Sequence, residues 1–249
     1  MTDAARLDAV LPPEAARSGA PIYRHGLATR VWHWVNAVAI FTLLGSGAMI
    51  SNAHPHLYWG QFGANPDHPW LNVVRFPGWV TIPSSYNLAL GRRWHLFFAL
   101  VLAFGLLGYM ATSLVNRHFA RDLHVRARDL APGAVWHDVR EHLALRFHDP
   151  ERPRDYNILQ KLAYVLAIFV LIPLMILTGL ALSPGMDAAW PWMLDLLGGR
   201  ASARSLHFIA AGGIAAFVVV HLTLVILAGV GQELRSIVTG WWQPPEETR

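Results

Sequence analysis

The sequence predicts an all-α integral membrane protein, a four-helix bundle, and three observations support this prediction. Of the 249 residues, 54% are hydrophobic and only 14% are charged, whereas a soluble domain usually carries about 25% charged residues. Four apolar runs are each long enough to cross a bilayer as a helix. Within these runs, Lys161 is the only Lys, Arg, Asp or Glu.

The elements follow from this pattern in chain order. The polar, proline-containing start of the chain predicts a flexible tail at residues 1–20, followed by a single membrane domain at 21–249. We expect the spanning helices at about 31–50, 94–115, 158–182 and 206–230. Pro173 should kink the third helix, because proline lacks the N–H that a helix needs. Within the 116–157 loop, alternating basic and apolar residues at 121–149 indicate an amphipathic surface helix.

Basic residues set the expected orientation. Most of the arginines lie in the N-terminal tail, the 116–157 loop or the C-terminal tail. Because basic loops stay in the cytoplasm, both termini are predicted to be cytoplasmic and the long loop 51–91 to face outward. This outer loop is rich in Trp, Tyr, Pro and Gly, so we expect it to fold onto the membrane surface. It would form a structural lid, and it could also be a docking platform for a partner.

The absence of cysteine narrows the possible chemistry. It excludes thiolate metal sites, iron–sulfur clusters and covalently attached haem, which leaves the 13 histidines as the main soft ligands. The net charge of +4 is unevenly distributed and does not indicate nucleic-acid binding.

Four histidines lie inside the predicted spans. His207 and His221 are 14 positions apart on the fourth helix, which places them within roughly 40° on one face and roughly 21 Å apart along the axis. By depth, His95 matches His207 on the outer side and His33 matches His221 on the inner side. Singly, His33, His95 and His207 are more simply explained as interfacial residues, whereas a deep His221 is costly without a function. Together the four predict two haems, each with its iron held by two imidazoles.

Other residues fall where a haem would need them. Gly47 lies 14 positions after His33, at the depth of the outer site, where a macrocycle could approach the backbone. Tyr109 lies 14 positions after His95, at the inner depth. Haem propionates would emerge near arginines at the helix ends, although arginines there are also ordinary topology anchors. The candidates are Arg92, Arg93 and Arg204 at the outer rim and Arg30 at the inner one.

These motifs resemble those of the di-haem cytochrome b family that includes bacterial cytochrome b561 and the membrane subunits of nickel–iron hydrogenases and formate dehydrogenase. The matching segments are RVWHW in the first helix, RRWH in the second and LHFIAAGGIAAFVVVH in the fourth. NAHPHLYWG, LTGLALSP and IVTGWW are most similar to the branch of thiosulfate reductase cytochrome b subunits.

The resemblance implies two haem b groups and electron transfer between a quinone and a periplasmic redox partner. In this branch the partner is a molybdopterin oxidoreductase, and the protein lies in the bacterial inner membrane among its lipids. His33 and His221 would bind the inner haem iron, and His95 and His207 the outer one. Asn36 and Tyr109 are candidates for the quinone site or the inner haem environment.

Two alternatives remain open. The chain could be a self-contained quinone-linked oxidoreductase, such as a superoxide oxidase similar to small members of the same superfamily. It could also be a haem-free anchor or transporter, which would leave the four depth-matched histidines unexplained. No internal repeat indicates a transporter.

Overall fold

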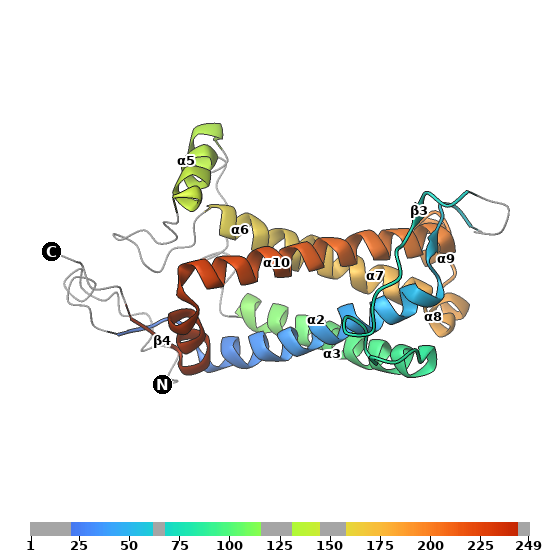
Figure 1. Cartoon of the computed structure of the whole chain (residues 1–249), viewed down its shortest axis with the longest axis horizontal. Helices are drawn as coiled ribbons and strands as arrows, with labels where there is room; N and C mark the ends of the chain where they lie inside the picture. The colour runs from blue at the N-terminus through green and yellow to red at the C-terminus, as the bar shows by residue number, and fades with distance from the viewer. Residues whose placement is uncertain (1–20, 62–67, 116–130, 145–157, 244–249) are drawn as a thin grey trace. The chain divides into compact units, whose positions relative to one another are not determined.

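The computed structural model describes residues 21–61, 68–115, 131–144 and 158–243. The expected tail at 1–20 and most of the 116–157 loop lie outside these ranges. The elements, shown in Figure 1, are β1 (Ile22–Tyr23), α2 (Leu27–Ala53), β2 (His56–Leu57), β3 (Leu71–Asn72), α3 (Leu88–Val115), α5 (Pro132–Leu143), α6 (Ile158–Val165), the π-helix η3 (Leu166–Leu171), α7 (Ile172–Leu182), α8 (Pro184–Ala189), α9 (Trp192–Leu196), α10 (Arg200–Thr239) and β4 (Trp241–Trp242).

The prediction of four long apolar helices is confirmed. The helices that could cross a membrane, by length and composition, are α2, α3, the continuous run α6–η3–α7 and α10. Each contains its predicted span, and α10 is the longest, with 40 residues. Gly229 interrupts the helical backbone of α10 with φ 105° and ψ 86°. Glycine is the residue that adopts a positive φ without steric cost.

The third span accommodates Pro173 in a specific way. The helix widens into the six-residue π-helix η3 just before α7, in which Pro173 lies in the first turn. The N–H of Ile172 accordingly bonds the carbonyl of Ala167, five residues back. Since proline cannot donate to the i−4 carbonyl and its ring crowds that group, a π-helical turn is one way to keep the backbone paired.

The chain divides into two compact units. The histidine unit comprises Trp32–Val125 and Gln160–His221, and the terminal unit comprises Met1–Val31, Arg126–Leu159 and Leu222–Arg249. All four span histidines belong to the histidine unit.

In the terminal unit, segments from the two ends of the chain pair with each other. β1 and β4 are antiparallel, with Ile22 opposite Trp242 and Tyr23 opposite Trp241. The N–H of Arg24 bonds the carbonyl of Gly240 at 2.8 Å. These contacts place residues that flank the first and last spans side by side. This unit also contains α5, whose Asp138 accepts a hydrogen bond from the N–H of Ile158 at 2.7 Å.

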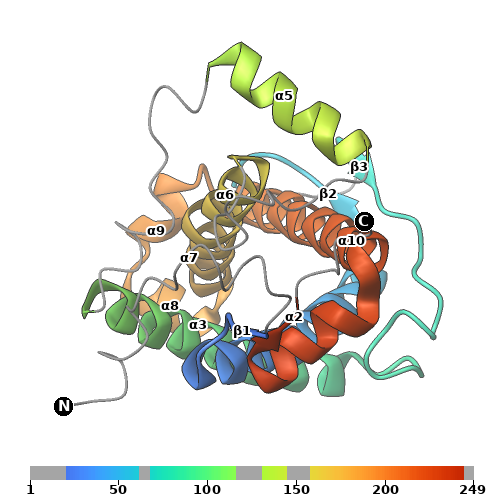
Figure 2. The ribbon, with the colours of Figure 1, turned by 90° about the vertical axis from the view of Figure 1, so that its left-hand side faces the viewer.

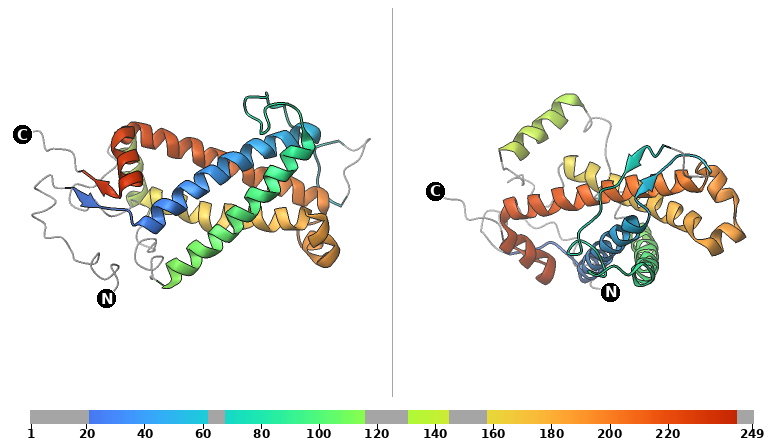
Figure 3. Two further views of the ribbon diagram at one scale, coloured as in Figure 1. Left: turned by 90° about the horizontal axis from the view of Figure 1, so that it is seen from below. Right: turned by 45° about the vertical axis from the view of Figure 1, so that its right-hand side comes forward.

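In the histidine unit, small residues face inward and large apolar residues face outward. On α2, Ala39 and Ser46 are fully buried, whereas Val38 and Phe41 are more than half exposed. This distribution is typical of membrane helices, whose contacts favour small side chains while large apolar ones meet lipid. Gly105 of α3 packs directly against the Trp32 ring, so α2 and α3 lie close together there. Figures 2 and 3 show these spans from other directions.

Candidate functional site

The histidine unit brings the four span histidines together as two pairs. The rings of His33 on α2 and His221 on α10 have centroids 6.4 Å apart. The rings of His95 on α3 and His207 on α10 have centroids 6.1 Å apart. These are the same pairs that matching by depth predicts, and α10 contributes one member to each.

Both separations suit an iron between two imidazoles. Two metal–nitrogen bonds of about 2 Å, plus about 1.1 Å from each nitrogen to its ring centre, give a centroid separation of roughly 6 Å. Among the described residues, no three His, Cys, Asp or Glu side chains gather at one metal-binding position. A haem needs only two protein ligands, because the porphyrin supplies the other four. The donor set therefore fits haem better than a bare metal ion.

The His95–His207 pair is held by hydroxyl groups on two further helices. His95 Nδ1 lies 3.0 Å from Ser46 Oγ on α2, and His207 Nδ1 lies 2.8 Å from Thr178 Oγ1 on α7. A hydrogen bond to the ring nitrogen that does not bind the metal fixes the orientation of a metal-binding imidazole. All four spans thus contribute a residue to this site.

Each of these hydroxyl residues is followed by a glycine that faces the same ring. A Cβ added at Gly47 would lie 3.5 Å from Cε1 of His95, and a Cβ added at Gly179 would lie 3.4 Å from Cε1 of His207. Gly47 therefore lies at the His95 site, as its spacing indicates. Sequence reasoning overlooked Ser46, Thr178 and Gly179, although the repeated Ser/Thr–Gly dipeptide inside an apolar span was a signal for them.

The His33–His221 pair has aromatic surroundings and unsatisfied polar atoms. Phe217 stacks on His221 with an interplanar angle of 5°, and Trp34 meets His33 edge-on. His33 Nδ1 and Asn36 Oδ1 are buried without a hydrogen-bond partner. Buried polar atoms normally have partners, so these two atoms are consistent with a bound group or water.

Tyr109 of α3 packs against α2 at Trp32. Its ring stacks on Trp32, the neighbour of His33 in sequence, with centroids 5.7 Å apart and an interplanar angle of 6°.

The predicted arginines occupy three different environments. Arg92 donates to Nε2 of His54 at 3.4 Å, and the pKa of His54 is lowered by burial and by the nearby charges of Arg204 and Arg92. Among the described residues, no carboxylate lies within ion-pair distance of Arg92 or Arg204. Arg93 is exposed, as Arg92 and Arg204 are, but it is not among the charges that act on His54. Arg30 donates to the carbonyl of Thr239 at 2.6 Å. Only Arg92 and Arg204 therefore form one cluster, with His54 between them.

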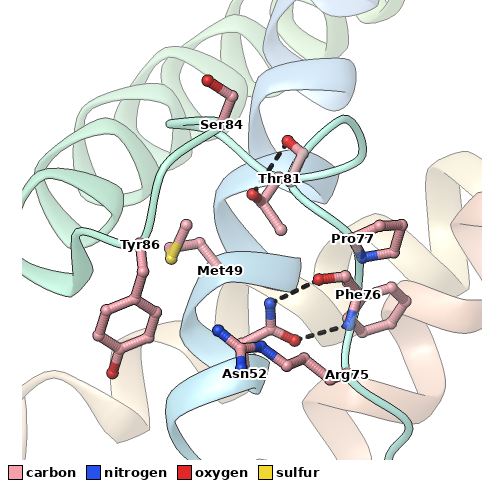
Figure 4. A pocket seen from close by; sticks show the side chains of 9 residues that line it. Met49, Asn52, Arg75, Phe76, Pro77, Thr81, Ser84 and Tyr86 are labelled. Carbon is pink, nitrogen blue, oxygen red and sulfur yellow. Dashed lines mark hydrogen bonds between the residues drawn. The ribbon is translucent and has the colours of Figure 1, made fainter.

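Within the 51–91 segment, the part that follows α2 is bonded to α10 and back to the last turn of α2. The indole N–H of Trp70 donates to Ser205 of α10 at 2.9 Å, and the hydroxyl of Ser205 donates to the carbonyl of Tyr58 at 2.6 Å. Asn52 of α2 bonds both the N–H and the carbonyl of Phe76, as Figure 4 shows beside a pocket of about 300 Å³. These bonds fix the segment to the spans, and its roles as a structural lid and as a docking platform remain predictions.

Comparisons with known proteins agree on one family. The family model described as prokaryotic cytochrome b561 matches residues 24–240. A probable Ni/Fe-hydrogenase B-type cytochrome subunit of Azotobacter vinelandii is 26% identical over 95% of this chain and 94% of its own length. A putative protein-methionine-sulfoxide reductase subunit, YedZ1, of Azospira oryzae is 30% identical over 85% of this chain and 93% of its own length. No solved structure matches the chain significantly.

Proposed function

Since the chain belongs to the prokaryotic cytochrome b561 family, we propose that it carries electrons between the quinone pool and a periplasmic redox partner through two b-type haems. Family membership and the four spans already make it a multi-pass inner-membrane subunit with b-type haem that transfers electrons. Family membership does not give the number of haems, their ligands or the two electron partners, and these are what we propose.

One observation carries the proposal: two histidine pairs at almost the same separation. His33 and His221 would hold the inner haem, and His95 and His207 the outer one, at centroid separations of 6.4 and 6.1 Å. Each bound iron would take up and pass on a single electron. Because His207 and His221 are 14 positions apart on α10, the two sites would lie roughly 21 Å apart along that helix.

The cationic cluster supports the position of the outer haem. Arg92 and Arg204 lack a carboxylate among the described residues, and guanidinium groups bind carboxylates strongly. Propionates entering this cluster would relieve the repulsion between the two arginines. We place the cluster on the periplasmic side and both termini in the cytoplasm, in agreement with the distribution of arginines. The pairing of β1 with β4 supports a common side for the two ends.

The relatives support the kind of partner. Their names assign them to a nickel–iron hydrogenase and to a methionine sulfoxide reductase. Each name describes a subunit of a redox enzyme. We propose a periplasmic enzyme of the molybdopterin class for this chain, and we place the quinone near Asn36 and Tyr109 on the inner side. The unsatisfied Oδ1 of Asn36 supports this location, because a quinone carbonyl brings a polar group that ordered water could link to it.

Haem stoichiometry tests the proposal. The full chain is purified in detergent, and its haem b is measured per chain by the pyridine haemochrome method. We expect two haems, and we expect reduced quinol to reduce both. One haem or none per chain would overturn the assignment. His56→Ala is the matched control, since His56 lies outside the spans and bonds Asn72. This variant should keep both haems.

A further inference from the structure

The hydroxyl groups of Ser46 and Thr178 have a geometry that decides which nitrogen of each bound histidine carries the proton. Ser46 Oγ lies 2.6 Å from the carbonyl oxygen of Thr42, and Thr178 Oγ1 lies 2.6 Å from the carbonyl oxygen of Leu174. Each hydroxyl therefore meets a backbone acceptor one turn earlier in its own helix, as well as a histidine Nδ1.

A hydroxyl has a single proton to donate. A carbonyl oxygen has none, so an oxygen–oxygen distance of 2.6 Å requires the hydroxyl proton to lie between the two oxygens. The hydroxyl oxygen is then only an acceptor toward the imidazole. His95 and His207 must therefore carry their protons on Nδ1, and each keeps a free lone pair on Nε2.

We propose that Ser46 and Thr178 are positioning residues that hold His95 and His207 in the Nδ1–H tautomer, so that both present Nε2 to iron. This inference rests on the proposed haem site. It adds that α2 and α7, which supply no ligand to the outer haem iron, set the tautomer of its two histidine ligands.

The burial of both hydroxyl groups strengthens the inference. Ser46 and Thr178 have no exposed surface, so water cannot easily replace either hydroxyl if it is removed. A Cβ added at Gly47 or Gly179 would meet Cε1 and Nδ1 of the facing ring, so each glycine lies on the side of the ring that also meets the hydroxyl. Hydroxyl and glycine thus act on the same edge of each ring.

The His33–His221 pair lacks such a hydroxyl contact at His33. His33 Nδ1 has no hydrogen-bond partner. A hydrogen bond donated from Nδ1 raises the basicity of the imidazole, and a more basic ligand stabilises ferric iron and lowers the reduction potential. The hydroxyl pair should therefore lower the potential of the His95–His207 haem selectively.

Three variants of matched shape test the proposal in the purified di-haem protein. Thr178→Val keeps the shape and loses the hydroxyl, Thr178→Ser keeps the hydroxyl, and Ser46→Ala removes the other one. Thr112→Val is the control, because Thr112 makes the same back-bond to Gly108, at 2.9 Å, without a histidine. The readouts are optical redox titration and the low-spin ferric signal in electron paramagnetic resonance.

We expect Thr178→Val and Ser46→Ala to move one midpoint potential to more positive values and to change one ferric signal. The affected haem should be the one that His207→Ala removes. Thr178→Ser and Thr112→Val should resemble the parent. Unchanged potentials and signals, or equal shifts of both haems, would overturn the inference. A parent protein with fewer than two haems would instead refute the proposed function, so the two failures are distinguishable.

Discussion

The imidazole rings of His95 and His207 have centroids 6.1 Å apart, although they belong to helices from opposite halves of the chain. His33 and His221 repeat this relationship at 6.4 Å. α10 contributes to both pairs, whereas α2 and α3 contribute one histidine each. Substitutions on these three helices should therefore affect the two proposed haems separately.

Replacing one histidine of a pair should remove one haem. We expect His207→Ala to lose the outer haem and keep most of the inner one, because each iron depends on its own two ligands. His221→Ala should do the reverse. Haem per chain and the reduced-minus-oxidised spectrum measure the outcome. Equal loss of both haems in each variant would argue against separate pairs.

A large side chain at Gly47 should displace the ring of His95. A Cβ there would lie 3.5 Å from Cε1 of His95, which is an ordinary contact, so Gly47→Ala should bind haem normally. Gly47→Leu adds atoms beyond that Cβ and should lower the content of the outer haem several-fold. The absorption spectrum of the purified variants measures this. Gly108→Leu is the control, because a Cβ at Gly108 meets nothing within 4 Å, and haem loss there would contradict the steric explanation.

The spans and the pairing of the histidines could be predicted from the sequence because both depend on local regularities. Span length follows from hydropathy, and the depth of a histidine follows from its position in the span. The partners of Ser46 and Thr178 could not be predicted this way. Which face of α2 meets α3, and which face of α7 meets α10, depends on packing between helices, which depth does not determine.

The same limit applies to the arginines. Their places at the helix ends were clear from the sequence, but Arg92 and Arg93 differ by 100° around the helix. Only the fold shows that Arg92 joins His54. Similarly, the sequence predicts a kink of the third span at Pro173, and the structure accommodates this proline with the π-helix η3. Both outcomes depend on neighbouring helices.

Removing the positive charge near the outer haem should lower its reduction potential. Reduction adds an electron, which nearby cations favour. We expect Arg204→Gln and Arg92→Gln to shift the outer midpoint to more negative values and to leave the inner one nearly unchanged. Arg93→Gln is the control, because Arg93 is not among the charges that act on His54 together with Arg92 and Arg204. Potentiometric titration measures the shift, which should be largest at low ionic strength. An equal shift in all three variants would contradict a specific role of Arg92 and Arg204.

His54 should make the stability of the protein sensitive to acid. Its pKa is lowered from 6.5, first by burial and then by Arg204 and Arg92. The unfolded chain therefore binds a proton at His54 more readily than the folded chain, and stability falls as the pH drops below 6.5 toward the lowered pKa. His54→Gln should flatten this dependence, measured as the thermal midpoint between about pH 7.5 and about pH 5.5. An unchanged slope would show that other groups cause it.

Ser205 should help to anchor the 51–91 segment on α10, beside the hydrogen bonds that Gly60 makes with Ala201 and Ser202. It is fully buried, accepts from the indole of Trp70 and donates to the carbonyl of Tyr58. Trp70→Phe removes one donor and should cost about 1 kcal/mol, whereas Ser205→Ala leaves two part-buried groups without their partner and should cost about 2 kcal/mol.

Thermal unfolding and limited proteolysis within the 51–91 segment measure these effects. Trp79→Phe is the matched control, since Trp79 is 86% exposed and its replacement should change stability by less than about 0.5 kcal/mol. If Ser205→Ala and Trp79→Phe destabilise the protein equally, the hydrogen bonds of Ser205 do not hold the segment. In that case the bonds of Gly60 to Ala201 and Ser202, or apolar contacts such as that of the buried Leu57, would be the main anchor.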